Sequence, residues 1–274
     1  MITCAITGSS GVLGQKIKKY LPYKFYEFKK DITNIKNVEK WINKKNFDII
    51  IHCAAVVPTN MVNNSYKKAY DVNVNGTLNL VNSILNKKKK PKWFFFSSTS
   101  HVYKLNTKFV RISEKNKPKP QSKYGKTKLL AEDILIKKLK NSSIKLCIGR
   151  IFSFTDKRQK VPFVIPTITE KIKSSKKIIT LKNLNHFRDF LNTKDIAKVI
   201  NVMRERECSG IYNIGSGIKF SLKNIAQLIS EKYNKKIKFL DSNKTTYLIS
   251  DNKKILRLNW KSANFKKNLN YFYK

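Results

Sequence analysis

The sequence predicts an α/β fold, a doubly wound parallel sheet followed by a smaller C-terminal α/β domain. Three observations support this prediction. Nearly unbroken apolar runs alternate with helical patterns up to about residue 155, as expected for parallel strands that helices cover on both faces. A glycine-rich turn follows the first apolar run. Beyond residue 155 the alternation weakens, and short strand and helix patterns mix.

The elements of the first part rest on hydrophobic periodicity. The expected strands are 2–7, 23–28, 47–55, 92–98 and 144–154. Helices are expected after the glycines of 8–14 and over 31–46, 65–86 and 122–135. Asp31 and Thr33 are the expected capping residues of the second helix. Together these elements predict a sheet that is wound on both faces.

The C-terminal part is expected to contain helices at 161–175, 193–206 and 221–233, with a cap near Thr193, and strands at 176–181 and 210–215. Residues 1–155, completed by about 190–215, are expected to form the first domain. Residues 156–189 and 216–274 are expected to form a smaller domain that covers the carboxyl edge of the sheet.

The composition is that of a globular chain in a reducing compartment. The chain has 274 residues, of which 41% are hydrophobic, so it can bury a sizeable core. Its four cysteines lie far apart without C-x-x-C spacing, which indicates buried thiols and no metal site. No apolar run reaches the ~18 residues of a membrane helix, and the chain opens directly into a strand. We therefore expect a cytoplasmic protein without a membrane partner.

The formal charge of +41 raises the question of a nucleic-acid partner. The basic residues are spread along the whole chain, and most are Lys rather than Arg, the better fork for phosphate and bases. This distribution favours a solvated Lys-rich surface over a dedicated nucleic-acid face. A protein whose basic surface holds RNA remains the alternative from a different functional class.

The first predicted strand runs into Thr7-Gly8-Ser9-Ser10-Gly11-Val12-Leu13-Gly14. Glycines at three-residue spacing between a strand and a helix permit a tight turn and a close backbone approach to a pyrophosphate, which the helix N-terminus then faces. The position directly after a strand favours dinucleotide binding over a purely structural turn.

A tyrosine and a lysine four residues apart share one face of a helix. In a chain so rich in Lys the spacing alone is weak evidence, since it occurs at Tyr20/Lys24, Tyr26/Lys30 and Tyr124/Lys128. Of the three, the pair at 124 and 128 follows a strand that ends in Ser and Thr, at the sheet edge where α/β folds bind ligands. This context predicts a catalytic pair.

These motifs resemble, in order, those of the extended short-chain dehydrogenase/reductase family, the Rossmann-fold nucleotide-sugar epimerases, dehydratases and 4-keto reductases. The family's T-G-x-x-G-x-x-G is matched at 7–14. Its H-x-A-A loop, its N-x-x-G-T-x-N-L helix and its Ser/Thr strand end are matched by "IHCAAV" (51–56), "NVNGTLNLV" (73–81) and "FFSSTSHVY" (95–103). Its Y-x-x-x-K, R-D-F-x-x-x-x-D-x-A and Y-N-x-G are matched by "YGKTK", "HFRDFLNTKDIAKVI" (186–200) and "YNIGSG" (212–217).

The resemblance implies a catalytic set of Thr99, Tyr124 and Lys128, in which Lys128 lowers the phenol pKa from its usual value of about 10. It also implies that NAD or NADP binds the same Tyr and Lys together with Gly8, Ser10, Gly11, Val12, Leu13, Gly14, Lys29, Asp31, Ile32, Cys53, Ala54, Ala55, Asn73 and Ser97. The implied substrate-binding residues are Ser98, Ser100, His101 and Arg188, and no metal is implied.

Several features divide the members of the family. Dehydratases carry Asp-Glu where this chain has Ser100-His101, which argues against elimination of water. His101 is either an additional acid or base or a loop histidine beside the substrate. The room for a single strand between Gly14 and Asp31 resembles the dTDP-4-dehydrorhamnose reductase type. In contrast, "FRDFLNTKDIA" resembles epimerases, in which the Arg contacts the nucleotide diphosphate. Arg188 pairing with Asp189 remains the structural alternative.

The resemblance implies an NAD(P)-dependent epimerase/dehydratase-family enzyme that transfers hydride at a hexose carbon, expected to be C4, of a nucleotide-diphosphate sugar. An NADP-dependent reductase of a 4-keto nucleotide sugar is the alternative, since Lys29 and Lys30 after the second strand suit a 2′-phosphate. A lipid or acyl dehydrogenase would need an apolar pocket in place of Arg188. A homodimer is expected from the resemblance alone.

Overall fold

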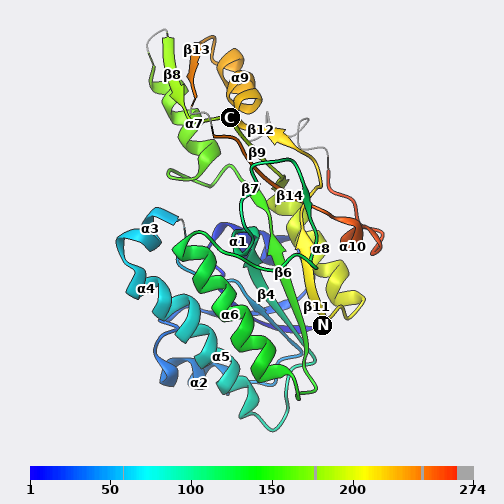
Figure 1. Cartoon of the computed structure of the whole chain (residues 1–274). Coiled ribbons are helices and arrows are strands. Elements are labelled where there is room, and N and C mark those ends of the chain that lie inside the picture. The colour runs from blue at the N-terminus through cyan, green and yellow to red at the C-terminus, as the bar shows by residue number, and fades with distance from the viewer. Residues whose placement is uncertain (58, 176–177, 242–243, 264–274) are drawn as a thin grey trace.

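The computed structural model describes residues 1–57, 59–175, 178–241 and 244–263. A six-stranded parallel sheet lies between two layers of helices, and a smaller α/β part with α7 and α9 lies at one end of it (Figure 1). The expected α/β class with a doubly wound parallel sheet is therefore confirmed.

The strand order of the main sheet is β2-β1-β3-β4-β6-β11, and all neighbours pair in parallel. The bounds are β1 Thr3–Thr7, β2 Lys24–Phe28, β3 Ile49–His52, β4 Trp93–Thr99, β6 Lys145–Ile151 and β11 Gly210–Ile214. The chain leaves β1 for β2 on one side and continues through β3 on the other. Such a reversal of strand order opens a crevice at the carboxyl ends of the strands.

The two faces of the sheet are buried by different helices. α1 (Val12–Tyr20) and α8 (Thr193–Glu205) pack on one face, and α2 (Ile35–Ile42), α5 (Gly76–Leu85) and α6 (Lys123–Leu139) on the other. Along β4, Trp93 and Phe95 enter the first core, and Phe94 and Phe96 enter the second. Alternation between two apolar layers explains why the strand is apolar at every position.

The segment expected as one helix over 65–86 is interrupted. α3 (Thr59–Asn64) and α4 (Tyr66–Tyr70) precede a π-helical turn, Asp71–Asn75, which continues into α5. π-helical turns inside helices widen the backbone and often occur at functional sites. This turn carries Asn73, which the motif had singled out.

Over its described residues, the smaller part consists of short sheets and three helices. β7 (Ser153–Thr155) pairs with β10 (Phe190–Asn192), and β8 (Ile178–Lys182) with β13 (Lys236–Leu240). A four-stranded sheet joins β12 (Phe220–Ser221), β9 (His186–Arg188), β14 (Thr246–Ser250) and β5 (Arg111–Ile112). α7 (Val164–Ser174) and α9 (Leu222–Lys232) share a core with β8 and β12, and α10 (Lys253–Leu256) packs near β11. Within the described residues, α3, β5, β9, β10 and α10 had no counterpart among the expected elements.

The expected cap of α2 at Asp31 or Thr33 was wrong, and the cap expected near Thr193 lies at the adjacent Asn192. Asn34 caps α2, its side-chain oxygen accepting from the Asn37 N–H at 3.2 Å, whereas the Asp31 carboxylate accepts from Thr33. Asn192 caps α8 by accepting from the Asp195 N–H at 2.8 Å. Asn, Asp, Ser and Thr cap almost equally well, so composition alone does not choose among neighbours.

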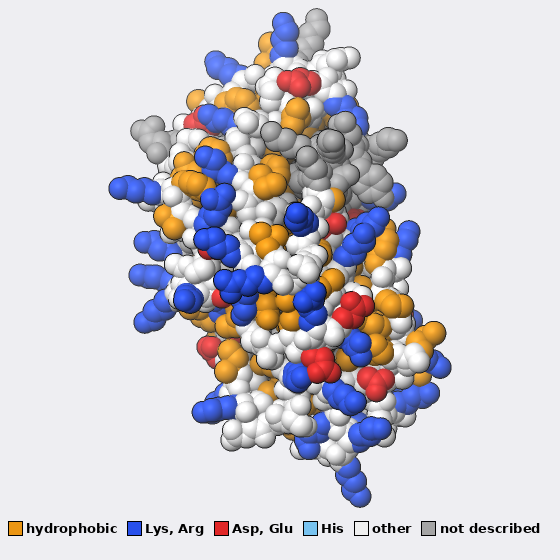
Figure 2. Space-filling model, turned by 90° about the vertical axis from the view of Figure 1, so that its right-hand side faces the viewer, with side chains coloured by type: hydrophobic (Ala, Val, Ile, Leu, Met, Phe, Trp, Pro, Cys, Tyr) orange, Lys and Arg blue, Asp and Glu red, His pale blue; other side chains and the backbone are white. Residues whose placement is uncertain are grey.

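Within the residues described, the helices are all too short or too polar to span a lipid bilayer. Figure 2 shows the basic side chains spread over the whole visible face, with acidic and apolar side chains between them. On that face the positive charge is not gathered into one patch.

The turn after β1 generates a prediction about Gly8. Its φ of +68° is unfavourable for other residues, and an added Cβ would lie 2.6 Å from backbone atoms of Cys53 and Ala54. We expect Gly8→Ala to lower the free energy of unfolding by about 3 kcal/mol, measured by denaturant titration. Gly11→Ala is the control, because a Cβ there meets its nearest atom at 3.3 Å without a positive φ, and should lose less than about 1 kcal/mol. Equal losses in both variants would contradict this account of the turn.

Candidate active site

The glycine turn between β1 and α1 leaves backbone groups accessible. The Gly11 N–H donates to the Gly8 carbonyl at 3.1 Å, and Ser10 and Gly11 are exposed while Leu13 lies in the core. Among the described residues no side chain caps α1, and its first turn carries no acidic residue. Unpaired N–H groups at a helix N-terminus suit the pyrophosphate of a dinucleotide. The turn therefore fits NAD or NADP.

The loop after β7 braces this turn. Arg158 donates to the Val12 carbonyl at 3.3 Å and to the Gln15 side chain, and Lys16 pairs with Asp156 at 3.2 Å. Asp156 is buried and also accepts from Thr193 at 2.5 Å. These contacts hold the start of α1 against the smaller part of the molecule.

His52 at the end of β3 and Asn73 on the π-helical turn hold the neighbouring loop after β3 in place. The His52 ring bridges Thr7 at 2.6 Å and Thr77 at 2.9 Å, and burial together with the Lys128 charge lowers its pKa to about 3. Asn73 is buried, accepts from the Val56 N–H at 2.7 Å and donates to Thr127 at 3.0 Å. Because its amide is used in this way, Asn73 fixes the loop that carries Cys53, Ala54 and Ala55 to α6.

Thr99, Tyr124 and Lys128 come together at the carboxyl edge of the sheet. Thr99 ends β4, and its hydroxyl is hydrogen-bonded to that of Tyr124. α6 approaches closely because Gly125 lies against the backbone of His101, where an added Cβ would meet the carbonyl at 2.2 Å. The Ser122 side chain starts this helix by accepting from the Gly125 N–H at 3.0 Å. Tyr124 is half-buried and Lys128 fully buried.

The pKa of Tyr124 differs from the expected direction. Burial raises it to about 12, and the hydrogen bond from Thr99 offsets only part of this effect. The expectation that Lys128 lowers the phenol pKa is wrong for this structure. The Lys128 ammonium lies 4.0 Å above the centre of the Phe96 ring, and the groups that favour its charged form are Cys53 and Glu132.

Burial also lowers the pKa of Lys128 to about 8. The Cys53 thiol is hydrogen-bonded to Ser97, and burial raises its pKa to about 12 even though Lys128 acts in the opposite direction. A neutral thiol and a neutral histidine therefore surround the ammonium on the β3 side at neutral pH. The site can exchange a proton near this lysine in the physiological range.

His101 and Arg188 lie on the side of the smaller part. The His101 ring packs edge-on to the Tyr124 ring at 5.9 Å, and its backbone N–H donates to the Thr99 hydroxyl at 3.2 Å. Solvent reaches the ring, but the surrounding protein atoms and the charge of Arg188 lower its pKa to about 4. His101 is therefore a neutral imidazole at pH 7.

Arg188 is held by neutral groups. Its guanidinium donates to the carbonyls of Phe187 and Thr246 at 2.8 and 3.1 Å and to the Thr246 hydroxyl at 3.1 Å. In the described part of the chain Asp189 is bonded to Ser216, Gly217 and Ser250 instead, so the alternative of an Arg188–Asp189 pair is not seen. Burial lowers the pKa of Arg188 to about 10. A half-buried cation on neutral partners suits an anionic ligand.

Other predicted residues lie elsewhere or point away. Ser98 is buried and its hydroxyl donates to Glu132, and Ser100 is buried in a short 3₁₀ turn, so their contact with a substrate stays a prediction. Lys29 and Asp31 are exposed just after β2, and the Asp31 carboxylate accepts from Thr33. Ile32 is a core residue. Among the described side chains no group of His, Cys, Asp or Glu is arranged to hold a metal ion.

The sequence interpretation missed a buried polar network behind the site. Arg150 on β6 binds the Glu132 carboxylate with Nε and Nη2, and donates to the Tyr103 hydroxyl at 2.8 Å. Tyr103 donates to Asn213 at 2.9 Å. An Arg inside the apolar run "KLCIGRI" was the available signal, because a buried cation needs an acidic partner.

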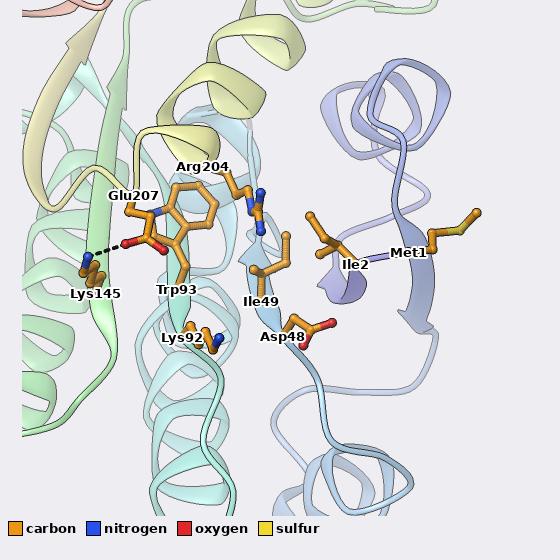
Figure 3. Close-up of a pocket in the computed structure, with 9 residues that line it drawn as sticks. All are labelled: Met1, Ile2, Asp48, Ile49, Lys92, Trp93, Lys145, Arg204 and Glu207. Atoms are coloured by element: carbon orange, nitrogen blue, oxygen red, sulfur yellow. Dashed lines mark hydrogen bonds and ion pairs between the residues drawn. The ribbon is translucent and has the colours of Figure 1, made fainter.

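A cavity of about 340 Å³ lies at the opposite edge of the sheet, where the strands begin (Figure 3). Among its lining residues, Lys145 and Glu207 form an ion pair at 2.5 Å beside Trp93, and Arg204 comes from the end of α8. None of the predicted site residues lines it. This hollow is therefore separate from the predicted site residues.

Comparison with known proteins agrees with these motifs. The family model described as GDP-mannose 4,6 dehydratase matches residues 7–267. The GDP-6-deoxy-D-talose 4-dehydrogenase of Aggregatibacter actinomycetemcomitans is 30% identical over 82% of this chain and 78% of that enzyme. The dTDP-D-glucose 4,6-dehydratase of Dictyostelium discoideum is 26% identical over 78% of this chain, which spans 51% of that enzyme.

Among solved structures, RMD from Pseudomonas aeruginosa in complex with NADPH superposes with a TM-score of 0.91 at 18% identity. The match covers 100% of this chain and 98% of that one. At this identity the likeness concerns the fold alone. It extends over both the main sheet and the smaller part.

The burial of Lys128 generates a prediction about stability. Since its pKa is about 8 in the folded protein and 10.5 in an exposed lysine, its burial is unfavourable below pH 8 and the penalty disappears as the pH rises toward 10.5. We expect Lys128→Met to raise the free energy of unfolding at pH 7 by about 2 to 3 kcal/mol, measured by denaturant titration. The advantage should shrink steadily between pH 8 and 10. A gain that is independent of pH would contradict the buried-charge explanation.

Proposed function

The chain belongs to the GDP-mannose 4,6 dehydratase family of extended short-chain dehydrogenases/reductases, which are NAD(P)-dependent enzymes of nucleotide sugars. From this premise we propose that it transfers hydride at C4 of a nucleotide-diphosphate hexose. The observation that carries the proposal is the hydrogen-bonded Thr99–Tyr124 pair beside the buried Lys128, at the same sheet edge as the glycine turn.

Two members of the proposed catalytic set, Thr99 and Tyr124, act directly on the sugar oxygen. The bound nicotinamide supplies or accepts the hydride. The Thr99 hydroxyl hydrogen-bonds the sugar oxygen, and Tyr124 gives that oxygen a proton or removes one. Because the phenol pKa is about 12, Tyr124 is protonated at neutral pH and is ready to act as an acid. This state suits reduction of a ketone more directly than oxidation of an alcohol.

The proposed substrate contacts are His101 and Arg188. Arg188 is the half-buried cation on the side of the smaller part, and its charge suits the diphosphate of a nucleotide sugar. His101, neutral and beside the Tyr124 ring, can donate or accept a hydrogen bond at the sugar. Residues 156–189 and 216–274 are accordingly proposed as the substrate-binding part and residues 1–155 as the cofactor-binding part.

Reduction of a 4-keto nucleotide sugar is the second candidate activity beside epimerisation, and one feature of the sheet favours it. β2 is the edge strand of the main sheet, so among the described residues no further strand follows it, as in the compact reductase type.

We also propose that the protein is a homodimer through α5 and α6, since Leu130 and Ile136 on α6 are 41% and 43% exposed.

Tyr124→Phe tests the catalytic proposal. Removing the phenol hydroxyl should reduce turnover by about 1000-fold, as expected when a proton-transfer group is lost. Dinucleotide binding should be kept. A panel of nucleotide sugars with NAD(H) and NADP(H) is followed by nicotinamide absorbance and by product mass, and cofactor affinity by fluorescence. Tyr26→Phe removes a tyrosine hydroxyl on the second strand and is the matched control. Its turnover rate should equal that of the wild type. Full activity in Tyr124→Phe would refute the proposal.

The exposed Lys29 decides between the two cofactors. If it binds a 2′-phosphate, Lys29→Ala should raise KM for NADPH about tenfold and leave KM for NADH unchanged. Lys36→Ala, on the exposed face of α2, serves as the control for general loss of positive charge. Equal effects of Lys29→Ala on both cofactors would exclude a 2′-phosphate contact.

A further inference from the structure

We propose that Glu132 is a positioning residue of the proposed hydride-transfer site, whose carboxylate fixes α6 against β4 and β6 and supplies the negative charge that keeps the Lys128 ammonium protonated. The inference rests on the proposed function for its kinetic consequence. Its structural part concerns the charge of Lys128 and does not depend on turnover.

The position of Glu132 follows from the geometry of α6. Tyr124, Lys128 and Glu132 are spaced four residues apart, so they lie on one face of the helix in successive turns. Glu132 is 0% exposed and Lys128 is 1% exposed. A carboxylate one turn beyond a buried ammonium, with little water between them, acts on it through a low effective dielectric.

The carboxylate is fixed from three elements. On β6, Arg150 binds both carboxylate oxygens, at 3.1 Å from Nε and 2.6 Å from Nη2. On β4, the Ser98 hydroxyl donates to the same carboxylate. Since Ser98 is the residue before Thr99, the Glu132 contact ties the catalytic helix to the strand that presents the Thr99 hydroxyl.

The groups around Lys128 single out Glu132 electrostatically. From the end of β3, His52 and Cys53 face the ammonium, and both are neutral at pH 7. From β4, Phe96 offers the face of its ring, and on α6 itself Tyr124 is a neutral phenol. Among the residues described, Cys53 and Glu132 favour the charged form of Lys128, and Glu132 is the one of the two that carries a carboxylate.

The Arg150 pair explains how the helix keeps such a carboxylate. Burial acts to lower the pKa of Arg150, but its hydrogen bonds to Glu132 and the charge of Glu132 outweigh burial and raise it. The guanidinium also lies over the Tyr103 ring at 4.9 Å. The contacts of Arg150 with Glu132 and Tyr103 would be enough for an ion pair with a structural role alone. Because Glu132 lies one helical turn from Lys128, the Arg150–Glu132 pair is also linked to the proposed hydride-transfer site.

The test compares pH profiles of Glu132→Gln and Asp133→Asn. Loss of the Glu132 charge should move the alkaline limb of the kcat profile about one unit to lower pH, so turnover at pH 8 falls about fivefold. Asp133 is the exposed acid next to it on the same helix, and D133N should leave the profile in place. An unmoved limb in E132Q, or an equal movement in D133N, overturns the proposal.

Two further measurements keep the test decisive. Because E132Q leaves Arg150 buried without its partner, the double variant E132Q/R150M provides a form without an orphan charge. It should fold and show a smaller movement of the limb in the same direction, and a wild-type limb in the folded double variant counts against the proposal. If no nucleotide sugar is turned over by the wild type, the proposed function fails. The Lys128 side-chain NMR resonance, assigned by its loss in K128R, then still reports whether E132Q lowers its titration midpoint.

Discussion

The burial of one ammonium group organises the centre of this molecule. Lys128 reaches the carboxyl edge of the sheet from α6 and is removed from water on all sides, which costs several kcal/mol for a charged group without partners. The surroundings reduce this cost with the Phe96 ring and the Glu132 carboxylate, while the nearby thiol and imidazole stay neutral. The arrangement leaves a lysine whose pKa lies near the physiological range, which is the property that proton transfer requires.

The sheet topology brings the other participants to that point. Parallel strands end at a common edge, so Thr7, His52 and Thr99 from three strands are close although they are far apart in the chain. The strand-order reversal between β1 and β3 keeps this edge free of a crossing connection. Contributions from later in the chain, above all Arg188 on β9 and the Asp156 loop, approach the edge from the smaller part. The site is therefore shared between elements that no single local motif contains.

The distribution of charge shows a division between surface and interior. Only 17 residues are acidic against 58 basic ones, yet several acids are buried where they hold the architecture. Asp156 forms an ion pair with Lys16 of α1, and Glu132 of α6 forms one with Arg150. Asp189 accepts hydrogen bonds from the turn at Ser216 and Gly217. The many lysines lie on a surface where solvent screens them and where they pack by their aliphatic stems. A large net charge is compatible with the fold because the buried acids are ion-paired or hydrogen-bonded.

The sequence by itself determined the strand and helix alternation and the glycine turn, because these depend on hydrophobic period and on short local spacing. Through its resemblance to the family it also predicted the Thr99, Tyr124 and Lys128 set. It also determined the family, through motifs in a fixed order. Only the tertiary structure decided that Ser98 points to Glu132, that Arg150 completes a buried pair, and that burial raises the Tyr124 pKa more than Thr99 lowers it. Those outcomes depend on which side chains share a low-dielectric interior, and residues distant in the chain meet there only after the layers have packed.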